Sequence, residues 1–316
     1  MSLTCKPPRS SERTVDAAPS IALSGQALEN SSREADLPEV VYTPESALRK
    51  PAILVRAMFT DLLASRELAW RMFVRDTKAA YRQSLLGYMW ILAPPLASTF
   101  LFVFLQSQKI LNVAATDVPY PVFVLTGMVL WEAFASALNA PLSVVSSSLS
   151  MLSKLNFPRE ALLLTSLYQV VFTLSIKLVL LAGVFLWFGV VPAWTVVFAP
   201  AGLLSLVALG FVLGLLLVPL GVLYQDVGRG IAMMLGAWML VTPVIYPPPA
   251  EWPAALINTI NPVSPLLTTT REWLTTGSPT QPVAFTTVSL VVVALLLVGW
   301  ILYRLAMPHL VARMSA

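Results

Sequence analysis

The sequence predicts an all-α, polytopic membrane protein with six transmembrane helices. Of its 316 residues, 57% are hydrophobic and only 11% are charged, whereas ordinary soluble domains carry roughly 25% charged residues. The apolar residues fall in blocks, and about 20 consecutive residues of helix cross the hydrocarbon layer of a bilayer. Basic residues cluster between these blocks, which is typical of membrane proteins whose orientation is set by positive charge. The main solvent of this chain is therefore expected to be lipid.

The first 50 residues are rich in Ser, Pro, Ala and charge and contain no apolar run. Such a composition cannot bury enough apolar surface to order a chain. Residues 1–50 are therefore expected to form a disordered cytoplasmic tail. A cleaved signal peptide would need an apolar region behind its positive start, and residues 1–30 offer none. The N-terminus is expected to stay with the mature protein.

Residues 51–85 predict an amphipathic helix lying along the membrane surface. Between Val55 and Arg82, apolar side chains such as Phe59 and Phe73 recur at helical spacing. A charged face recurs by the same rule and consists of Glu67, Arg71, Arg75, Lys78 and Arg82. A basic face beside anionic head groups is typical of interfacial helices. The same arginines are also candidates for handling an anionic, lipid-linked substrate.

Six apolar blocks form the predicted transmembrane domain within residues 86–316. They cover residues 86–106, 120–143, 161–188, 194–222, 230–247 and 283–303. Six crossings place both termini on one side of the membrane. Of the 20 Lys and Arg, Lys177 falls within a span and only Lys109 and Arg271 fall on the opposite side, which leaves 17 on the side of the termini. This excess predicts that both termini are cytoplasmic.

The segment 246–282 breaks the apolar pattern, because it is too polar and too rich in proline to span. It contains two short apolar pieces, at about 254–260 and 266–274. On the predicted topology this segment faces outward. We expect this segment to form short re-entrant helices before the last span that cap the mouth of a pore. Irregular backbone is tolerated at membrane depth when it is buried in protein or lines a water-filled cavity.

The sequence offers little for catalysis or cofactor binding. His309 is the only histidine and Cys5 the only cysteine, so a Ser-His-Asp triad, an internal disulfide and a cysteine-based zinc site are not expected. No G-x-x-x-x-G-K-[ST] phosphate loop is present, so the chain is not expected to bind ATP by that route. The basic clusters are explained by membrane orientation, and nucleic-acid binding is not expected. No cofactor or metal is therefore expected on this chain.

Two charged residues fall inside predicted spans. Glu132 lies near the middle of the second span and Lys177 near the middle of the third. A charged side chain in a span costs about 2.5 to 3.5 kcal/mol on insertion scales and rarely persists without a reason. Because the two spans run antiparallel, the two residues fall at similar depth. Two interpretations remain open: a midplane ion pair, or two residues that each face a wet cavity or tunnel.

Aromatic residues are dense at the ends of the predicted spans, Tyr88 and Trp90 among them. An interfacial aromatic belt explains most of these positions. Sugars also stack on aromatic faces, so some of these residues are candidates for lining a sugar-conducting tunnel. Periodicity does not choose between the two roles.

Three pieces of sequence stand in a fixed order. The first is Arg75-Asp76 followed by Tyr81-Arg82-Gln83-Ser84-Leu85-Leu86-Gly87-Tyr88, Trp90 and Pro94; the second is Phe157-Pro158-Arg159-Glu160; the third is Asn261-Pro262, Pro265 and Arg271-Glu272. Together, from about residue 56 to the end, they resemble the ABC-2 type permeases that export polysaccharides, a family with the O-antigen, capsule and teichoic acid exporters. Two positions depart from the family: Ala80, where relatives often carry a basic residue, and Glu132, where a small polar amide is common.

The resemblance implies a homodimer of six-span subunits that encloses a channel in the bacterial inner membrane. It implies two copies of a separate ATPase, which bind ATP and Mg, and a lipid-linked polysaccharide as substrate. The helix before the first span would form a gate with lipid contacts, and the candidates there are Arg71, Arg75, Arg82, Tyr88 and Trp90. The loop around residues 145–158 would contain a coupling helix that docks into the ATPase; the coupling candidates are Lys154, Phe157, Pro158, Arg159 and Glu160.

Three other functions remain open at this stage. A permease of the same type could carry another lipid or a drug. A membrane glycosyltransferase would also have many spans, but the largest outer loop offers only Glu251, Arg271 and Glu272 as charged residues. A stand-alone secondary transporter is disfavoured by the short chain and by the lack of recognisable halves.

Overall fold

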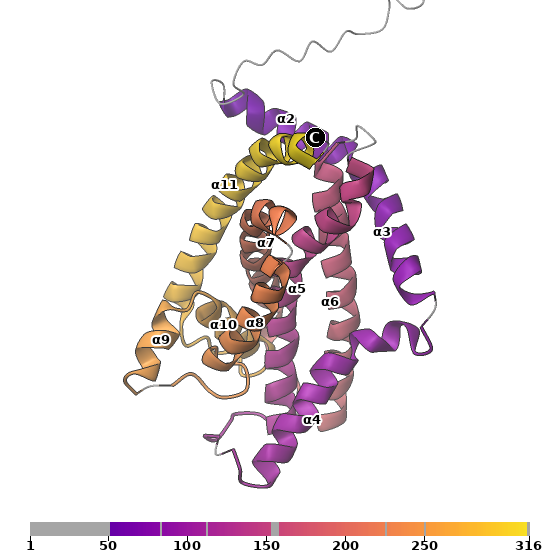
Figure 1. Cartoon of the computed structure of the whole chain (residues 1–316). Helices are drawn as coiled ribbons and strands as arrows, with labels where there is room; N and C mark the ends of the chain where they lie inside the picture. Colours follow the sequence, from indigo (N-terminus) through magenta and orange to yellow (C-terminus); the bar gives the residue numbers. More distant parts are fainter. Residues whose placement is uncertain are drawn as a thin grey trace, which may run out of the picture. The chain divides into compact units, whose positions relative to one another are not determined.

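The part of the chain that the structure describes is helical. The computed structural model describes residues 51–82, 84–111, 113–152, 158–224, 226–249 and 251–314, and it has no strand among them. The predicted tail 1–50 lies outside the described residues. The chain divides into two units, residues 1–54 and 55–316, and the contacts given below are those within the second. Figure 1 shows its helices, coloured along the sequence.

Four helices are long and apolar enough to cross a membrane. They are α5 (Tyr120–Leu152), α6 (Glu160–Phe188), α7 (Ala199–Leu223) and α11 (Pro282–Met314). A short 3₁₀ helix, η3 (Trp194–Phe198), leads into α7. These helices match the second, third, fourth and sixth predicted spans. The prediction of a multi-pass helical protein is confirmed to this extent.

The first and fifth predicted spans are shorter helices. After the 3₁₀ helix η2 (Gly87–Ile91), α4 (Ala93–Ser107) has 15 residues, and α8 (Asp226–Val241) has 16. Helices of these lengths measure about 22–24 Å at 1.5 Å per residue, less than the roughly 30 Å of a hydrocarbon core. Prolines set these limits: Pro94 and Pro95 stand at the start of α4 and Pro243 follows α8, and proline cannot donate the backbone bond that would continue a helix through it.

The surface helix predicted over residues 51–85 is divided into two helices. α2 (Pro51–Ala64) and α3 (Arg66–Tyr81) are separated at Ser65. The Ser65 hydroxyl donates to the Asp61 carbonyl at 2.6 Å, a local bond that often bends a helix. α3 also packs along α6 and buries Ala69, Met72 and Phe73 there. One face of α3 is therefore covered by protein.

The central helix is α5, which packs against α4, α6, α7 and α8. Its closest partner is α7, where Gly210 and Gly214 face the backbone carbonyls of Phe134 and Leu138. A Cβ atom at either glycine would overlap the facing carbonyl oxygen. This G-x-x-x-G spacing is the one that lets membrane helices approach closely. The α5–α7 contact therefore depends on the absence of a Cβ atom at these two glycines.

Side-chain contacts fix the directions of the long helices. The Tyr303 hydroxyl of α11 donates to the Arg159 carbonyl at 3.3 Å, so the end of α11 lies beside the start of α6. At the opposite end, the Thr195 hydroxyl donates to the Trp273 carbonyl at 3.1 Å, so the start of α7 lies beside the segment that leads into α11. α5, α7 and α11 therefore run in one direction and α6 in the other.

α8 runs antiparallel to α5. The rings of Trp238 and Phe134 lie 5.3 Å apart, and further along the chain the Tyr120 hydroxyl donates to the Ile245 carbonyl at 3.2 Å. The chain thus returns along α5 from the end of α7 toward the start of α11.

The outer segment contains two short helices, as predicted from its apolar pieces. α9 (Ala254–Ile260) matches the first piece, and α10 (Val263–Leu274) contains the second. Every residue of 263–271 is buried, and α10 packs against α5, α7, α11 and η3. α10 is therefore a core element in this chain. The apolar face of α10 fills the space between the long helices, and the re-entrant or pore-capping role expected for this segment stays a prediction.

The glycine contact between α5 and α7 gives a prediction whose sign opposes helix propensity. Gly210→Ala and Gly214→Ala should each lower the free energy of unfolding by about 1–3 kcal/mol, because the added methyl group overpacks a carbonyl. Alanine would otherwise favour a helix by about 1 kcal/mol. Thermal unfolding of the purified protein in detergent measures the effect. Gly183→Ala in α6 is the matched control, since a Cβ there meets no atom within 4 Å; equal destabilisation at all three sites would contradict the prediction.

Candidate functional site

The structure brings the two intramembrane charges together. Lys177 of α6 and Glu132 of α5 form an ion pair with 2.7 Å between Nζ and Oε2. Their side chains are 8% and 15% exposed, respectively. Leu174 and Leu181, on the same side of α6, pack into apolar clusters. Of the two interpretations left open by the sequence, this geometry favours the ion pair.

The pair joins α5 to α6 in surroundings where water cannot screen the charges. Two opposite charges at such a distance attract far more strongly in an apolar medium than in water. The desolvation of both groups offsets much of this attraction, so removing one partner costs more than removing both. The interaction therefore constrains which residues of α5 and α6 face each other more than it raises stability.

Breaking the pair on one side should destabilise the protein more than removing it altogether. Glu132→Gln and Lys177→Met should each lower the free energy of unfolding by about 3–5 kcal/mol, because a lone charge stays buried. The double variant should lie closer to the wild type. Thermal unfolding in detergent and the amount of protein in the membrane report the effect. Asp226→Asn, which removes the exposed pair of Asp226 with Arg229, serves as control; a double variant as unstable as the worse single one would argue against the pairing.

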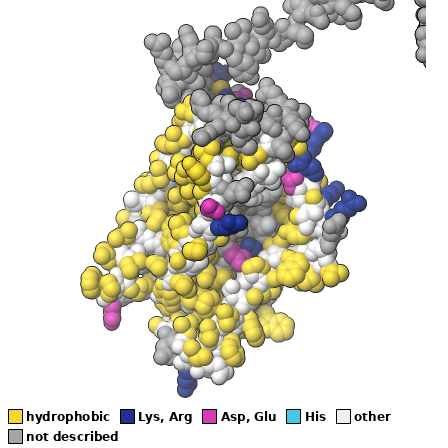
Figure 2. All heavy atoms as spheres, in the orientation of Figure 1, with side chains coloured by type: hydrophobic (Ala, Val, Ile, Leu, Met, Phe, Trp, Pro, Cys, Tyr) yellow, Lys and Arg dark blue, Asp and Glu magenta, His cyan; other side chains and the backbone are white. Residues whose placement is uncertain are grey.

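A basic face runs along α3. The basic residues on it are exposed and comprise Arg71, Arg75, Lys78 and Arg82. Figure 2 shows Lys and Arg side chains gathered there, beside a surface that is mostly hydrophobic. Arg71 pairs with Glu67 at 2.6 Å and Arg75 with Asp76 at 2.9 Å. Exposed pairs such as these contribute roughly 0–1 kcal/mol, so they give way readily to an anionic ligand.

A row of aromatic rings attaches α3 to α6 beneath this basic face. Trp70 and Phe73 of α3 contact Tyr168 of α6, and Phe73 also contacts Phe172, with ring centroids 5.2–6.1 Å apart along the row. Edge-to-face pairs of this kind contribute about 0.5–1.5 kcal/mol each beyond the area they bury. The aromatic side chains in the predicted amphipathic stretch thus serve first to anchor α3.

The row continues into the first motif. Tyr88 of η2 contacts Phe172 at 5.7 Å and Tyr81 at 4.6 Å between ring centroids. Burial, and to a lesser extent the neighbouring Tyr88, raises the pKa of the Tyr81 phenol above its ordinary value, so this hydroxyl is a neutral donor at physiological pH. Gly87 has a φ of +52°, a backbone conformation that glycine adopts without strain. The turn at Gly87 brings Tyr88 back toward α3.

The first motif borders an open cavity of about 730 Å³. Its lining comes from Ser84 to Met89, Leu92, Phe172 and Ile176. Tyr88 and Trp90 are 47% and 56% exposed, so both rings present a free face. Tyr88 lines the cavity and also contacts Tyr81 at the end of the basic helix, and Arg82 and Trp90 are close to these two residues in the sequence. Basic and aromatic side chains of this kind are complementary to a ligand with an anionic group and apolar or sugar faces.

The coupling candidates divide into described and undescribed residues. Lys154 and Phe157 lie outside the described residues. α5 continues to Leu152, so about half of the loop predicted over residues 145–158 is helix; the apolar and serine-rich stretch before Leu152 has no residue that ends a helix. Pro158 is exposed and Arg159 half-buried. Glu160, at the start of α6, is buried.

Glu160 is paired with a residue that sequence reasoning missed. Arg304 of α11 lies 3.0 Å from Glu160 and 2.6 Å from Asp61 of α2. The available signal was that each of Asp61 and Arg304 is a lone charge in an apolar stretch. Nothing in the periodicity of either stretch indicates that the two meet, because 243 positions separate them.

The outer-segment candidates are used inside the protein. The Asn261 side chain accepts hydrogen bonds from Trp238 Nε1 at 3.0 Å and the Val263 amide at 3.1 Å, and it donates to the Thr242 hydroxyl at 2.9 Å. Pro262 stands just before α10. These bonds attach α10 to the end of α8. Asn261 is buried, and both its amide oxygen and its amide nitrogen bond within the protein, so its role is structural.

The motif pair Arg271-Glu272 has two different roles. Arg271 is 4% exposed, donates to the Pro243 and Val244 carbonyls at 3.0 and 3.2 Å, and stacks on the Phe123 ring at 3.8 Å. Burial lowers its pKa to about 10, so it stays charged at neutral pH. Glu272 accepts bonds from the Thr280 amide and hydroxyl at 2.8 and 2.7 Å. Both residues stabilise the backbone of the outer segment.

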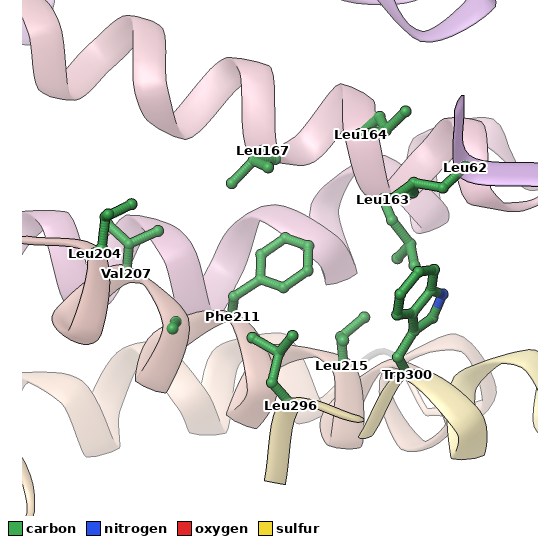
Figure 3. Close-up of a pocket in the computed structure, with 11 residues that line it drawn as sticks. Leu62, Leu163, Leu164, Leu167, Leu204, Val207, Phe211, Leu215, Leu296 and Trp300 are labelled. Carbon is green, nitrogen blue, oxygen red and sulfur yellow. The ribbon is translucent and has the colours of Figure 1, made fainter. Parts of the chain in front are cut away.

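An apolar crevice of about 230 Å³ lies between α6, α7 and α11, with α2 at one end. Figure 3 shows ten of the side chains that line it: Leu62, Leu163, Leu164, Leu167, Leu204, Val207, Phe211, Leu215, Leu296 and Trp300. All of these are hydrocarbon except for the indole nitrogen of Trp300. Burying a polar group here would cost free energy without a compensating hydrogen bond, so the crevice complements hydrocarbon.

The four membrane-length helices, the buried ion pair between two of them and the basic helix beside them are the features of a multi-pass membrane protein. No family model matches the chain. It is 29% identical over 219 residues to the O-antigen export system permease protein RfbA of Myxococcus xanthus, covering 66% of this chain and 80% of the relative. It is 26% identical over 250 residues to a permease of the same name from Klebsiella pneumoniae, covering 73% and 91%.

A capsule-type relative is also similar. The chain is 21% identical over 247 residues to the polysialic acid transport protein KpsM of Escherichia coli, covering 74% of this chain and 91% of the relative. These similarities confirm the resemblance to ABC-2 type polysaccharide-export permeases that the three sequence pieces indicate.

Proposed function

We propose that the chain is the transmembrane permease subunit of an ABC exporter that moves a lipid-linked polysaccharide of O-antigen type across the bacterial inner membrane. The observation that carries this proposal is the similarity to three O-antigen export permeases, each matched over at least 78% of its length. Because the sequence lacks a phosphate loop, ATP and its Mg ion belong to a separate ATPase subunit. We infer a homodimer that works with two copies of this subunit.

Six crossings are part of the proposal, with both termini in the cytoplasm. α5, α7 and α11 run in one direction, so the chain must return between α7 and α11, and α8 supplies this return along α5. It must also pass from the Asp61–Arg304 contact to the start of α5 at the opposite end, and α4 lies on that route. α4 and α8 are short for a span, which a bilayer accommodates by thinning locally.

Labelling of single cysteines tests this topology. On a Cys5→Ser background, Lys109→Cys should react with a membrane-impermeant thiol reagent in intact spheroplasts, because the α4–α5 connection faces outward. Arg229→Cys, in the first turn of α8, should react only after permeabilisation. Each variant must be shown to reach the membrane in normal amount. Reaction of position 229 from outside, or protection of position 109, would contradict six crossings.

Arg71, Arg75 and Arg82 are the proposed contacts for the anionic head of the lipid-linked substrate. A lipid-linked glycan carries negative charge near the membrane surface, and one exposed guanidinium group can bind two phosphate oxygens at once. Tyr88 and Trp90 offer ring faces on which sugar or lipid can pack. This reading is supported by the open cavity that the first motif borders.

Transport in this chain would depend on movement, because the sequence offers no chemistry of its own. ATP-driven closure of the partner subunits would act on the cytoplasmic ends of the helices, where the segment around residues 153–160 connects α5 to α6. We propose that Arg159 and Glu160 lie at the edge of this docking region, together with Lys154, Phe157 and Pro158.

Loss of the gene tests the function directly. Cells without the permease should accumulate the lipid-linked polymer in the cytoplasm and lack it at the surface, and the wild-type gene should restore export. The double variant Arg75→Glu/Arg82→Glu should export at least roughly tenfold less polymer than the wild-type gene. Each contact between like charges weakens substrate binding by on the order of 1 kcal/mol. Quantifying surface and intracellular polymer by antibody or gel measures both results.

The control variant is Arg229→Glu, which reverses an exposed charge away from α3. Cells without the gene that make no polymer at all would favour a glycosyltransferase. Unchanged surface polymer in those cells would refute polysaccharide export and favour a different cargo.

A further inference from the structure

At the end of α11, one arginine binds carboxylates from two other helices. Arg304 Nη1 lies 3.0 Å from Glu160 Oε1 of α6, and Nη2 lies 2.6 Å from Asp61 Oδ2 of α2. A guanidinium presents its N–H groups in a fixed planar fork, so two acceptors can be held at once in a defined geometry. A lysine ammonium has no such fork. The Arg304 side chain of α11 therefore connects α2 and α6 as well.

The two arms of this contact differ in burial. The Glu160 side chain is 9% exposed, that of Arg304 28% and that of Asp61 42%. A second bond, from the Tyr303 hydroxyl to the Arg159 carbonyl, also ties α11 to the start of α6. The α11–α6 arm is thus doubly fixed and largely dry. The arm to Asp61 is the more accessible one and can open at lower cost.

α2 lies at the edge of a cavity. Leu62, next to Asp61, lines the apolar crevice whose other walls are α6, α7 and α11. On the neighbouring turn, the edge of Phe59 contacts the ring of Trp300 with 5.3 Å between centroids. A helix beside unfilled space can shift without overlapping packed side chains, whereas a close-packed element cannot. Among the described contacts, Asp61–Arg304 and Phe59–Trp300 join α2 to α11, and Met58 of α2 is also buried.

Movement of α2 reaches the basic helix directly. Ser65, which joins α2 to α3, is 1% exposed. Its amide donates to the Asp61 carbonyl and its carbonyl accepts the Ala69 amide, both at 2.9 Å. The helical hydrogen bonding is therefore almost continuous through the break, and α3 follows when α2 is displaced.

We propose that Arg304 is a positioning residue that couples α11 and the start of α6 to α2, so that a displacement imposed by the ATPase reaches the basic face of α3. This proposal rests on the proposed function, because that function puts the ATPase at the end of the bundle where Arg304 lies. Arg304 contacts neither substrate nor nucleotide in this role. It acts through Asp61 and Glu160.

The deciding variant is Asp61→Asn, which keeps the shape of a partly exposed side chain and removes its charge. In inverted membrane vesicles containing the permease and its ATPase, polysaccharide transported per ATP hydrolysed should fall about fivefold or more, a usual size for coupling between sites. The amount of permease and its melting temperature should stay close to wild type. Arg304→Lys should also lower the amount of polysaccharide transported per ATP hydrolysed. Asp61→Glu keeps the negative charge and should leave this ratio close to the wild-type value. Asp226→Asn, which removes an exposed pair elsewhere, should change nothing.

An unchanged ratio of transport to hydrolysis in Asp61→Asn would overturn the proposal. So would a loss of transport that is fully accounted for by a smaller amount of permease, since the contact would then be merely structural. Wild-type vesicles that hydrolyse ATP without moving polysaccharide would give a different result, because they would refute the proposed function and this proposal with it.

Discussion

Hydrocarbon accepts no hydrogen bonds, and this constraint governs the whole structure. A backbone placed in lipid must satisfy its own polar groups, which a helix does within one segment. Helices in lipid gain little from hiding apolar surface from one another, so close contact decides how they associate. Here the contact between α5 and α7 depends on Gly210 and Gly214, which let α7 reach the carbonyls of α5. The remaining helices are arranged around this pair.

Charged side chains that join two or more helices fix the positions of those helices relative to one another. Lys177 and Glu132 join α5 to α6 away from water, and Arg304 joins α6 and α11 to α2 at the end of the bundle. Arg271 attaches the turn after α8 to α5 through two carbonyls and a ring face. By contrast, the arginines on α3 are exposed and only loosely paired. Buried charges thus set the architecture, whereas the exposed arginines of α3 make only local ion pairs.

The sequence predicted much of the fold because spans have a strong local signal. Long apolar blocks gave four helices, and equal depth in antiparallel spans made a contact between Glu132 and Lys177 one of two interpretations, which the observed ion pair then favoured. Prediction was weaker where local bonds compete with periodicity, as at Ser65, whose hydroxyl bends back within its own helix. It was weakest for the burial of α10, because a pair of leucines followed by three threonines does not reveal whether a short helix lies on the surface or inside.

Composition and block lengths by themselves determined that this chain is a multi-pass helical membrane protein, and three ordered motifs determined which family it resembles; the charge asymmetry predicts how its loops are oriented. Each of these properties is local or additive along the chain, so no contact has to be known. Tertiary structure alone decided that Arg304 meets Asp61 and Glu160, that α10 is buried and that α3 is attached to α6 by aromatic rings. These contacts depend on how helices that are distant in the sequence pack side by side. The pattern of residues along the sequence does not contain that geometry.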